Sequence, residues 1–425
     1  MRWLAEVTGA EVDGLEVGSH TLEFRPSDPP TALRRKVGTG KISIVSGSGA
    51  ASALLIFQAV FPFLLFAGGA GNGDAAGATI DGKEENENRD QNQNSEPIEL
   101  EIHGGTNVSF SPSWEYVDQV LLPALEDIFG LGPIERRLEQ RRWAQGSAPD
   151  APRGTIYLKF RPIRAGRTLK PSPSSAWAHA SRAPNDAGAR KIHHIDATVL
   201  APAPLLEPLQ NALALDLETL FPDAETRFAV VEDSGHASRV YVLLVAVSET
   251  GVRWGRDFLN GRSTRGMGKK GGRGRTRKGE SKEIDPEEVA AEISQKVSRD
   301  LRAELDRGGV VDEYLQDQLV VFQALAEGQT GFTRGVGPSS SSASSGIPAA
   351  AAGRRGNIER SVADMTLNED GAKMPFKKDK KTHEPFGEGS THTTTARWVA
   401  SSLLPTAQWF NRGAVCEGAG VSFLE

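Results

Sequence analysis

The sequence predicts a mixed fold of the α/β or α+β class, because segments with strand periodicity alternate with segments of helical periodicity along its 425 residues. Apolar residues recur at every second position, as in half-buried strands, in four segments: 20–24, 98–102, 155–160 and 239–247. They recur three and four residues apart, as on the buried face of a helix, in three others: 111–128, 286–305 and 312–326. Neither an all-helical nor an all-strand class accounts for both patterns.

The helix expected at 286–305 has the clearest ends. Asp285 is a good capping residue, and Pro286 suits the first turn, where its missing N–H has no partner to lose. Gly308 and Gly309 stop the helix. Its buried face is expected to hold Val289, Ile293, Val297, Leu301 and Leu305. The helix expected at 312–326 buries a similar stripe, formed by Leu315, Leu319, Phe322 and Ala326.

Composition limits the class of protein. Apolar residues make up 38% of the chain, which also has 46 glycines and 24 prolines, and this favours an ordered core interrupted by disordered insertions. The net charge is −6, so a nucleic-acid partner would need a local basic patch. The single cysteine, Cys416, excludes disulfides and cysteine-rich zinc sites within the chain and fits a reducing compartment. The first residues, MRWLAEVTGAEVDG, lack a signal-peptide layout.

The apolar run at 49–72 is long enough to span a membrane. Gln58 and Pro62 interrupt it, and no Lys or Arg cluster flanks it closely. We therefore expect a buried helix that ends near Pro62, followed by a buried strand at 63–67, and no membrane span.

A tract rich in Gly, Arg and Lys carries nine basic residues between Arg262 and Lys282. Such a tract can bind phosphate backbones or act as a nuclear localisation segment, and a passive solvated loop fits the composition equally well.

The helix at 312–326 has a second, polar face. Tyr314, Asp317 and Gln318 recur on it at three- and four-residue spacing, so a phenol, a carboxylate and an amide are aligned and could hold a polar ligand. Spacing alone also fits an ordinary solvated face. His392, which lies among hydroxyl side chains near a helix start, is a weak catalytic candidate by pattern alone.

Common nucleotide-binding motifs are missing. The segment VGTGKIS at 37–43 lacks the spacing of a P-loop, and the Gly/Ser-rich turn at 47–52 is only a weak anion-binding signal. The eight histidines show no metal-ligand spacing with cysteine or aspartate.

Four segments, read together and in order, resemble RNA 3'-terminal phosphate cyclases in their eukaryotic form. The most specific are GGVVDEYLQDQLVVFQALAEG at 308–328 and IHGGTNVSFSPSWEYVDQVLLPAL at 102–125. The apolar helix with its Gly/Ser turn at 47–69, and HTTTARW at 392–398 followed by VCEGAGVSF at 415–423, are looser matches. With the intervening elements the resemblance covers about two-thirds of the chain.

The resemblance implies an enzyme that uses ATP and a divalent metal, Mg²⁺ or Mn²⁺, to convert an RNA 3'-phosphate end into a 2',3'-cyclic phosphate. In this ligase-type chemistry a histidine attacks the α-phosphorus of ATP and forms a covalent adenylate. AMP then passes to the RNA 3'-phosphate, and the neighbouring 2'-OH displaces it. An imidazole suits this role because it is a competent nucleophile when neutral near pH 7.

Carried over by position, His392 is the expected nucleophile. Tyr314 would stack near adenine, and Asp317 would lie near the histidine or the metal, which makes it the one possible metal ligand. The remaining ATP-binding residues are expected to be Gln58, Pro112 and Gln318.

The implied fold is a large domain of repeated βαβαββ-like units with a smaller inserted α/β domain. We assign the first part of the large domain to 1–162, with a disordered loop at 71–96, and its last part to 286–425, with a low-complexity insertion at 335–390. Between them we expect a linker at 163–189, the inserted domain at 190–262 and a basic linker at 263–285.

The chain departs from the family at its start, where a strand and helix with a Glu-Gly-Gly-Gly-Gln motif are missing, so we expect an N-terminally truncated sequence. The expected partner is RNA with a 3'-phosphate end, in the nucleus (nucleoplasm) or the cytoplasm. A non-catalytic cyclase-like factor in RNA processing or ribosome assembly is the alternative. The presence of the histidine and of the Tyr/Asp helix favours the enzyme.

Overall fold

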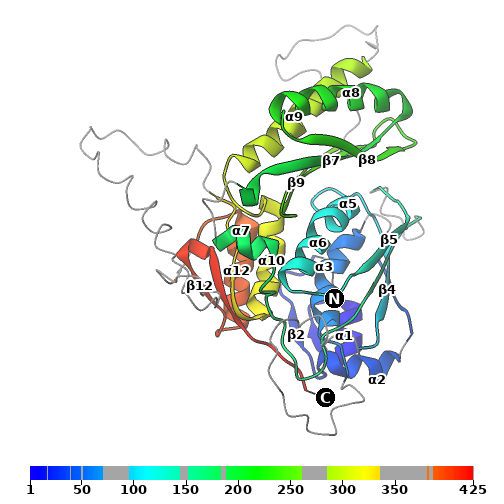
Figure 1. Ribbon diagram of the computed structural model, residues 1–425. Coiled ribbons are helices and arrows are strands. Elements are labelled where there is room, and N and C mark those ends of the chain that lie inside the picture. The colour runs from blue at the N-terminus through cyan, green and yellow to red at the C-terminus, as the bar shows by residue number, and fades with distance from the viewer. Residues whose placement is uncertain are drawn as a thin grey trace, which may run out of the picture.

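The structure is a computed structural model that describes residues 1–16, 18–38, 40–48, 51–69, 95–143, 152–182, 188–260, 285–335, 381 and 386–424. It confirms the mixed α/β class, with both mixed and antiparallel sheets. Two stacked parts are visible in Figure 1. We call the upper part, formed by residues 188–260 and 285–307, the small unit, and the rest of the described chain the large unit. The basic tract, the acidic loop at 71–94 and nearly all of 336–385 lie outside the described residues.

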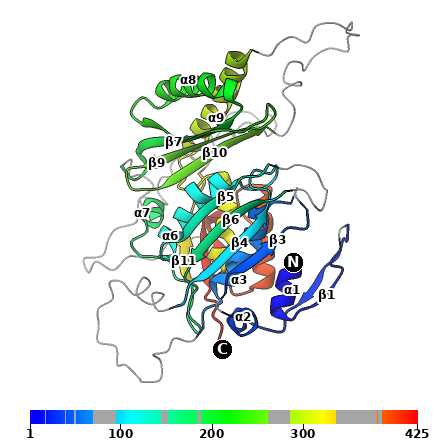
Figure 2. The ribbon, with the colours of Figure 1, turned by 90° about the vertical axis from the view of Figure 1, so that its right-hand side faces the viewer.

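The large unit contains a four-stranded sheet with helices on one side. Its strands are β3 (Ile42–Val45), β4 (Ile98–Gly104), β5 (Glu135–Gln140) and β6 (Gly154–Phe160), in the order β3-β4-β6-β5, and Figure 2 shows them side by side. The helices are α3 (Ala53–Leu65), α5 (Trp114–Tyr116) and α6 (Leu122–Ile128), with a π-helical stretch at Val117–Leu121 between the last two. Strand β4 alternates buried and half-buried residues, as its sequence pattern predicts.

The large unit has a second sheet, whose helices and strands follow one another along the chain in the same order as those of the first. Helix α10 (Glu313–Leu325) leads into β11 (Glu327–Gly331), and α12 (Thr391–Leu403) leads into β12 (Gln408–Phe410) and β13 (Val415–Ala419). The order β11-β13-β12, antiparallel throughout, matches β4-β6-β5 of the first sheet. Rings from both halves meet in one core: Phe61 lies 5.0 Å from Phe160 and 6.1 Å from Phe322 between ring centroids.

Helix α3 corrects one prediction. It continues through Pro62 to Leu65, so neither the expected end near Pro62 nor the strand at 63–67 forms. Pro62 removes the hydrogen bond to the carbonyl of Gln58 and its ring crowds that carbonyl, but the burial of Phe61, Leu64 and Leu65 outweighs this cost. Within the described residues, no helix is long and apolar enough to cross a membrane.

The small unit is a four-stranded sheet covered on one side by two helices. Its strands are β7 (Ile192–Ala201), β8 (Glu225–Asp233), β9 (Val240–Ser248) and β10 (Arg253–Asn260), in the order β10-β9-β7-β8. The helices are α8 (Ala203–Leu220) and α9 (Pro286–Leu305). Helix α9, which begins the range 286–425 that we assigned to the large domain, packs on α8, β9 and β10 of the small unit.

The remaining elements are short. The N-terminal residues form α1 (Arg2–Thr8), the paired strands β1 (Glu11–Asp13) and β2 (Glu23–Arg25), and α2 (Leu33–Val37), so the strand expected at 20–24 is only three residues long. Part of the expected linker forms α7 (Ala176–Arg182), in which Trp177 is buried. Single 3-10 turns lie at Pro30–Ala32, Gly188–Arg190 and Asn411–Gly413.

Candidate active site

Helix α10 presents the polar face that its sequence predicts. Asp312 caps the helix: its Oδ1 accepts hydrogen bonds from the backbone N–H groups of Tyr314 and Leu315, both at 2.9 Å. The apolar stripe through Leu315, Leu319 and Phe322 faces the core, whereas Tyr314 is 41% exposed. The helix is therefore anchored on one side and offers its phenol to solvent on the other.

Three of the predicted site residues form a chain of hydrogen bonds. The amide of Gln58 on α3 donates to Oε1 of Gln318 on α10. The amide of Gln318 in turn donates to Oδ1 of Asp317 at 2.9 Å. These bonds join two helices whose glutamines are 260 positions apart in the sequence, and they hold the Asp317 carboxyl in a fixed direction.

The Asp317 carboxyl is a candidate for chemistry near neutral pH. Burial raises its pKa to about 6, although the hydrogen bond from Gln318 and the charge of His392 both act to lower the pKa. A carboxyl with such a pKa changes charge within the physiological range, as groups at functional sites often do.

His392 lies close enough to Asp317 for the two to interact electrostatically. It is exposed in the first turn of α12, whose cap is Ser390: the Ser390 hydroxyl accepts from the N–H of Thr393 at 3.1 Å. Because α12 packs along α10, the histidine is brought beside the polar face of that helix.

Pro112 lies on the loop that joins β4 to α5, between two anchored serines. The hydroxyl of Ser111 is hydrogen-bonded to that of Ser52, the cap of α3. The hydroxyl of Ser113 is 2.6 Å from the phenol oxygen of Tyr241 on β9. The loop is thus fixed to both the large and the small unit.

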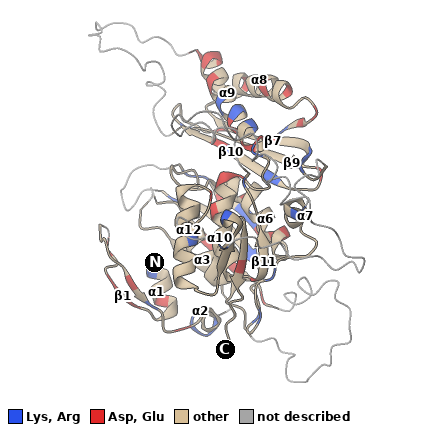
Figure 3. Cartoon of the chain, turned by 90° about the vertical axis from the view of Figure 1, so that its left-hand side faces the viewer, with Lys and Arg blue, Asp and Glu red and all other residues tan. Residues whose placement is uncertain are grey.

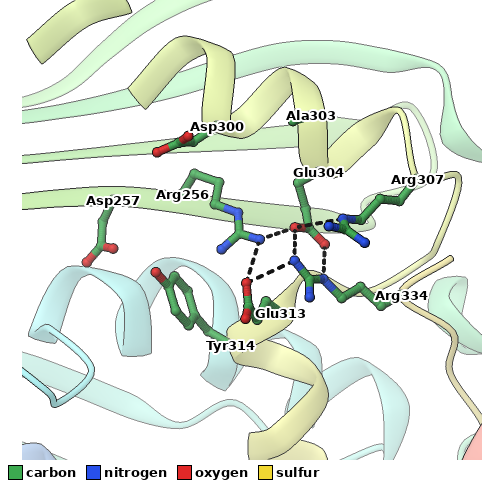
Figure 4. A pocket seen from close by; sticks show the side chains of 9 residues that line it. All are labelled: Arg256, Asp257, Asp300, Ala303, Glu304, Arg307, Glu313, Tyr314 and Arg334. Atoms are coloured by element: carbon green, nitrogen blue, oxygen red, sulfur yellow. Dashed lines mark hydrogen bonds and ion pairs between the residues drawn. The ribbon is translucent and has the colours of Figure 1, made fainter. Parts of the chain in front are cut away.

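Tyr314 borders a polar cavity of about 270 Å³ between the two units (Figure 4). Its wall includes charged residues of β10, α9 and α10. In Figure 3 both acidic (red) and basic (blue) stretches of the ribbon lie where α10 faces the small unit. The lining residues are Arg256, Asp257, Asp300, Ala303, Glu304, Arg307, Glu313, Tyr314 and Arg334.

Sequence reasoning missed most of this cavity. Glu304 was the available signal, because it falls on the apolar stripe of α9 after Leu301, and a carboxylate there needs a buried partner. Asp257, which is half-buried, also lines the cavity, and burial raises the pKa of its carboxyl to about 6, against the hydrogen bond from Tyr241 and the charge of Arg256.

Few side chains at this site could bind a divalent metal. Among the residues that the structure describes, no group of three or more His, Cys, Asp or Glu side chains could hold an ion. Asp317 is the one carboxyl among the predicted site residues. This fits Mg²⁺, which commonly binds through one or two carboxylates together with substrate phosphates and water.

Comparison with known proteins gives a consistent result. A family model described as RNA 3'-terminal phosphate cyclase matches residues 1–345. An RNA 3'-terminal phosphate cyclase of Methanosarcina mazei is 25% identical over 334 residues, which cover 77% of this chain and 74% of the relative. The protein of the same name from Drosophila melanogaster is 25% identical over 329 residues, covering 77% and 70%. The matched range of the family model includes Gln58, Pro112, Tyr314, Asp317 and Gln318 and ends before His392.

Proposed function

Because this chain belongs to the RNA 3'-terminal phosphate cyclase family, we propose that it converts an RNA 3'-phosphate end into a 2',3'-cyclic phosphate with ATP as the co-substrate. The observation that carries the proposal is the line of side chains from Gln58 through Gln318 to Asp317, whose carboxyl lies within electrostatic range of His392. A nucleophile and an oriented carboxyl on neighbouring helices are the minimum apparatus for covalent nucleotidyl transfer.

In the first step His392 is the nucleophile. Its neutral imidazole nitrogen forms a bond to the α-phosphorus of ATP, and pyrophosphate leaves. Positive charge develops on the ring, and the anionic Asp317 carboxylate stabilises that charge, as the carboxylate of a catalytic triad does. Gln318 keeps the carboxylate in place, which limits the reorganisation that the step requires.

In the second step the adenylyl group moves to an oxygen of the RNA 3'-phosphate, and the P–N bond to His392 breaks. The neighbouring 2'-hydroxyl then attacks the activated phosphorus, loses its proton, and AMP leaves. Asp317 would be the protein ligand of a divalent metal, Mg²⁺ or Mn²⁺, and the metal would supply charge that neutralises the phosphate groups. The exposed ring of Tyr314 stacks on the adenine, and Pro112 closes the same pocket.

The test is adenylate formation with ATP labelled at the α-phosphorus, in the presence of Mg²⁺ or Mn²⁺. We expect an acid-labile label on the protein that His392→Ala abolishes, whereas His236→Ala, which removes an exposed histidine of the small unit, leaves it unchanged. Added RNA with a 3'-phosphate should discharge the label as AMP and become cyclic at its end.

A label that persists in His392→Ala would exclude this histidine as the nucleophile. An unmodified wild-type protein that still binds RNA would instead support the alternative, a non-catalytic cyclase-like factor in RNA processing or ribosome assembly. We further propose that the protein acts in the nucleus or the cytoplasm, which tagged protein in cells would test.

A further inference from the structure

Arg256 of the small unit lies over the ring of Tyr314. Its guanidinium carbon is 5.0 Å from the ring centroid, within the range of a cation–π contact (Figure 4). The ring of Tyr116 also contacts it and stands at 88° to it, with the centroids 5.7 Å apart. The tyrosine is thus contacted by a guanidinium and by a second ring, while 41% of the residue stays exposed.

The Arg256 guanidinium is itself held firmly. It is paired with Glu304, whose side chain is only 1% exposed, and lies 3.3 Å from Oε2 of Glu313. Arg334 binds the same two carboxylates, at 2.7 and 2.8 Å from the oxygens of Glu304 and 2.9 Å from Glu313. Two guanidinium groups therefore share two carboxylates, and a planar group bound in this way has little freedom to rotate.

The strand that carries Arg256 is docked directly on the start of α10. The backbone N–H of Gly255 donates to Oδ2 of Asp312 at 2.8 Å, and the Tyr116 hydroxyl donates to Oδ1 of the same carboxylate at 2.7 Å. A Cβ at residue 255 would lie 2.6 Å from the Tyr116 ring, so only glycine permits this approach. Strand β10 is in this way part of the support for Tyr314.

We propose that Arg256 is a positioning residue that fixes the Tyr314 ring for the base of ATP, so that the small unit sets the affinity for the nucleotide. The proposal rests on the proposed function, because it takes the base of a nucleoside triphosphate as the ligand of the exposed ring. Arg256 holds one face of the ring, and the base takes the exposed part. An ammonium in place of the guanidinium keeps the charge but loses the planar contact.

The matched pair Arg256→Lys and Arg334→Lys tests this. Both variants place an ammonium against Glu304 and Glu313, but only Arg256 lies over Tyr314. In adenylate formation we expect Arg256→Lys to raise KM for ATP about three- to tenfold with kcat within about twofold. Arg334→Lys, which keeps the guanidinium over Tyr314, should raise KM less than Arg256→Lys at a similar loss of thermal stability. Equal changes in KM for the two variants would overturn the proposal.

A second measurement uses Tyr314→Leu as the background. If Arg256 acts through the ring, Arg256→Lys has no further effect on KM in that background, whereas an undiminished effect contradicts the proposal. If the wild-type protein binds ATP but forms no adenylate, the proposed function fails, and the same comparison is made on the Kd for ATP from equilibrium dialysis. Absence of ATP binding by the wild-type protein would refute both.

Discussion

Helices α3 and α10 occupy matching places in the two sheets of the large unit and have opposite roles. Each is 13 residues long and begins after a side-chain cap, Ser52 or Asp312. Each has a glutamine at its sixth position, and these two glutamines bond to one another. At the second position α3 has Leu54 and α10 has Tyr314. At the fifth position α3 has Phe57 and α10 has Asp317.

The two pairs of residues differ completely in environment. Leu54 and Phe57 are 0% and 1% exposed and belong to the core. Tyr314 is exposed to solvent, and Asp317 carries a carboxyl whose pKa is raised to about 6 by burial. The same backbone thus serves as core in one half and as the candidate site in the other, and two positions of one turn make the difference.

The largest expected effect comes from truncating the matching positions Phe57 and Asp317. Phe57→Ala should lower the free energy of unfolding by about 3–5 kcal/mol, because it leaves a cavity against Phe61, 4.9 Å away between centroids. Asp317→Ala should lower the rate of adenylate formation about a hundredfold or more without comparable destabilisation. Urea unfolding measures the free energy of unfolding of both variants, and the adenylate assay measures their rates of adenylate formation. Similar stability losses in both variants would remove the contrast between the helices.

The next effect concerns pH. Because burial raises the pKa of Asp317 to about 6, the folded chain holds this proton more tightly than the unfolded chain between about pH 4 and 6. The stabilisation from proton binding is present at low pH and is lost as pH rises to about 6. Asp317→Asn should therefore gain up to about 3 kcal/mol relative to wild type across that window.

Unfolding free energies of wild type and Asp317→Asn at several pH values would show this gain. Phe57→Leu serves as the control: because it keeps Asp317, the difference between its unfolding free energy and that of wild type should not change with pH. Parallel curves for wild type and Asp317→Asn would mean that the carboxyl has an ordinary pKa. In the wild-type protein the rate of the proposed adenylate formation should also fall below about pH 6, where the carboxylate is neutralised.

The smallest effect lies in the contact that joins the helices. Gln58→Ala and Gln318→Ala each remove the hydrogen bond between the two amides, so a double-mutant cycle should give a coupling of about 0.5–1.5 kcal/mol. Gln318→Ala alone should also slow adenylate formation, because Gln318 orients Asp317, whereas Gln58→Ala should slow it less. Additive stability losses would show that the pairing carries no energy.

Much of the local structure was predictable from the sequence. The cap at Asp285, the helix that follows it to Leu305 and the buried stripe from Val289 to Leu301 form as expected, while Leu305 is half-buried. The inward residues of the helix after Ser113, such as Val117 and Leu125, are buried as predicted. These features depend on neighbours within about four residues along the chain, so their signals lie in short windows of sequence.

Longer-range outcomes were not predictable in this way. The continuation of α3 through Pro62 depends on rings from β6 and α10 that pack against Phe61. The pairing of Arg256 with Glu304 joins a strand and a helix whose packing no local pattern specifies. Periodicity identifies which residues are buried, but it does not identify their partners.

The sequence by itself determined the mixed α/β class, the ends of α9 and α10, and the alignment of Tyr314, Asp317 and Gln318 on one helical face. That is because the spacing of residues along a helix or strand by itself determines which side chains lie on the same face. Only the tertiary structure decided that Gln58 meets Gln318, that His392 comes within electrostatic range of Asp317, and that Arg256 covers Tyr314. Those contacts join separate elements, and their positions follow from how whole helices and sheets bury their apolar faces together.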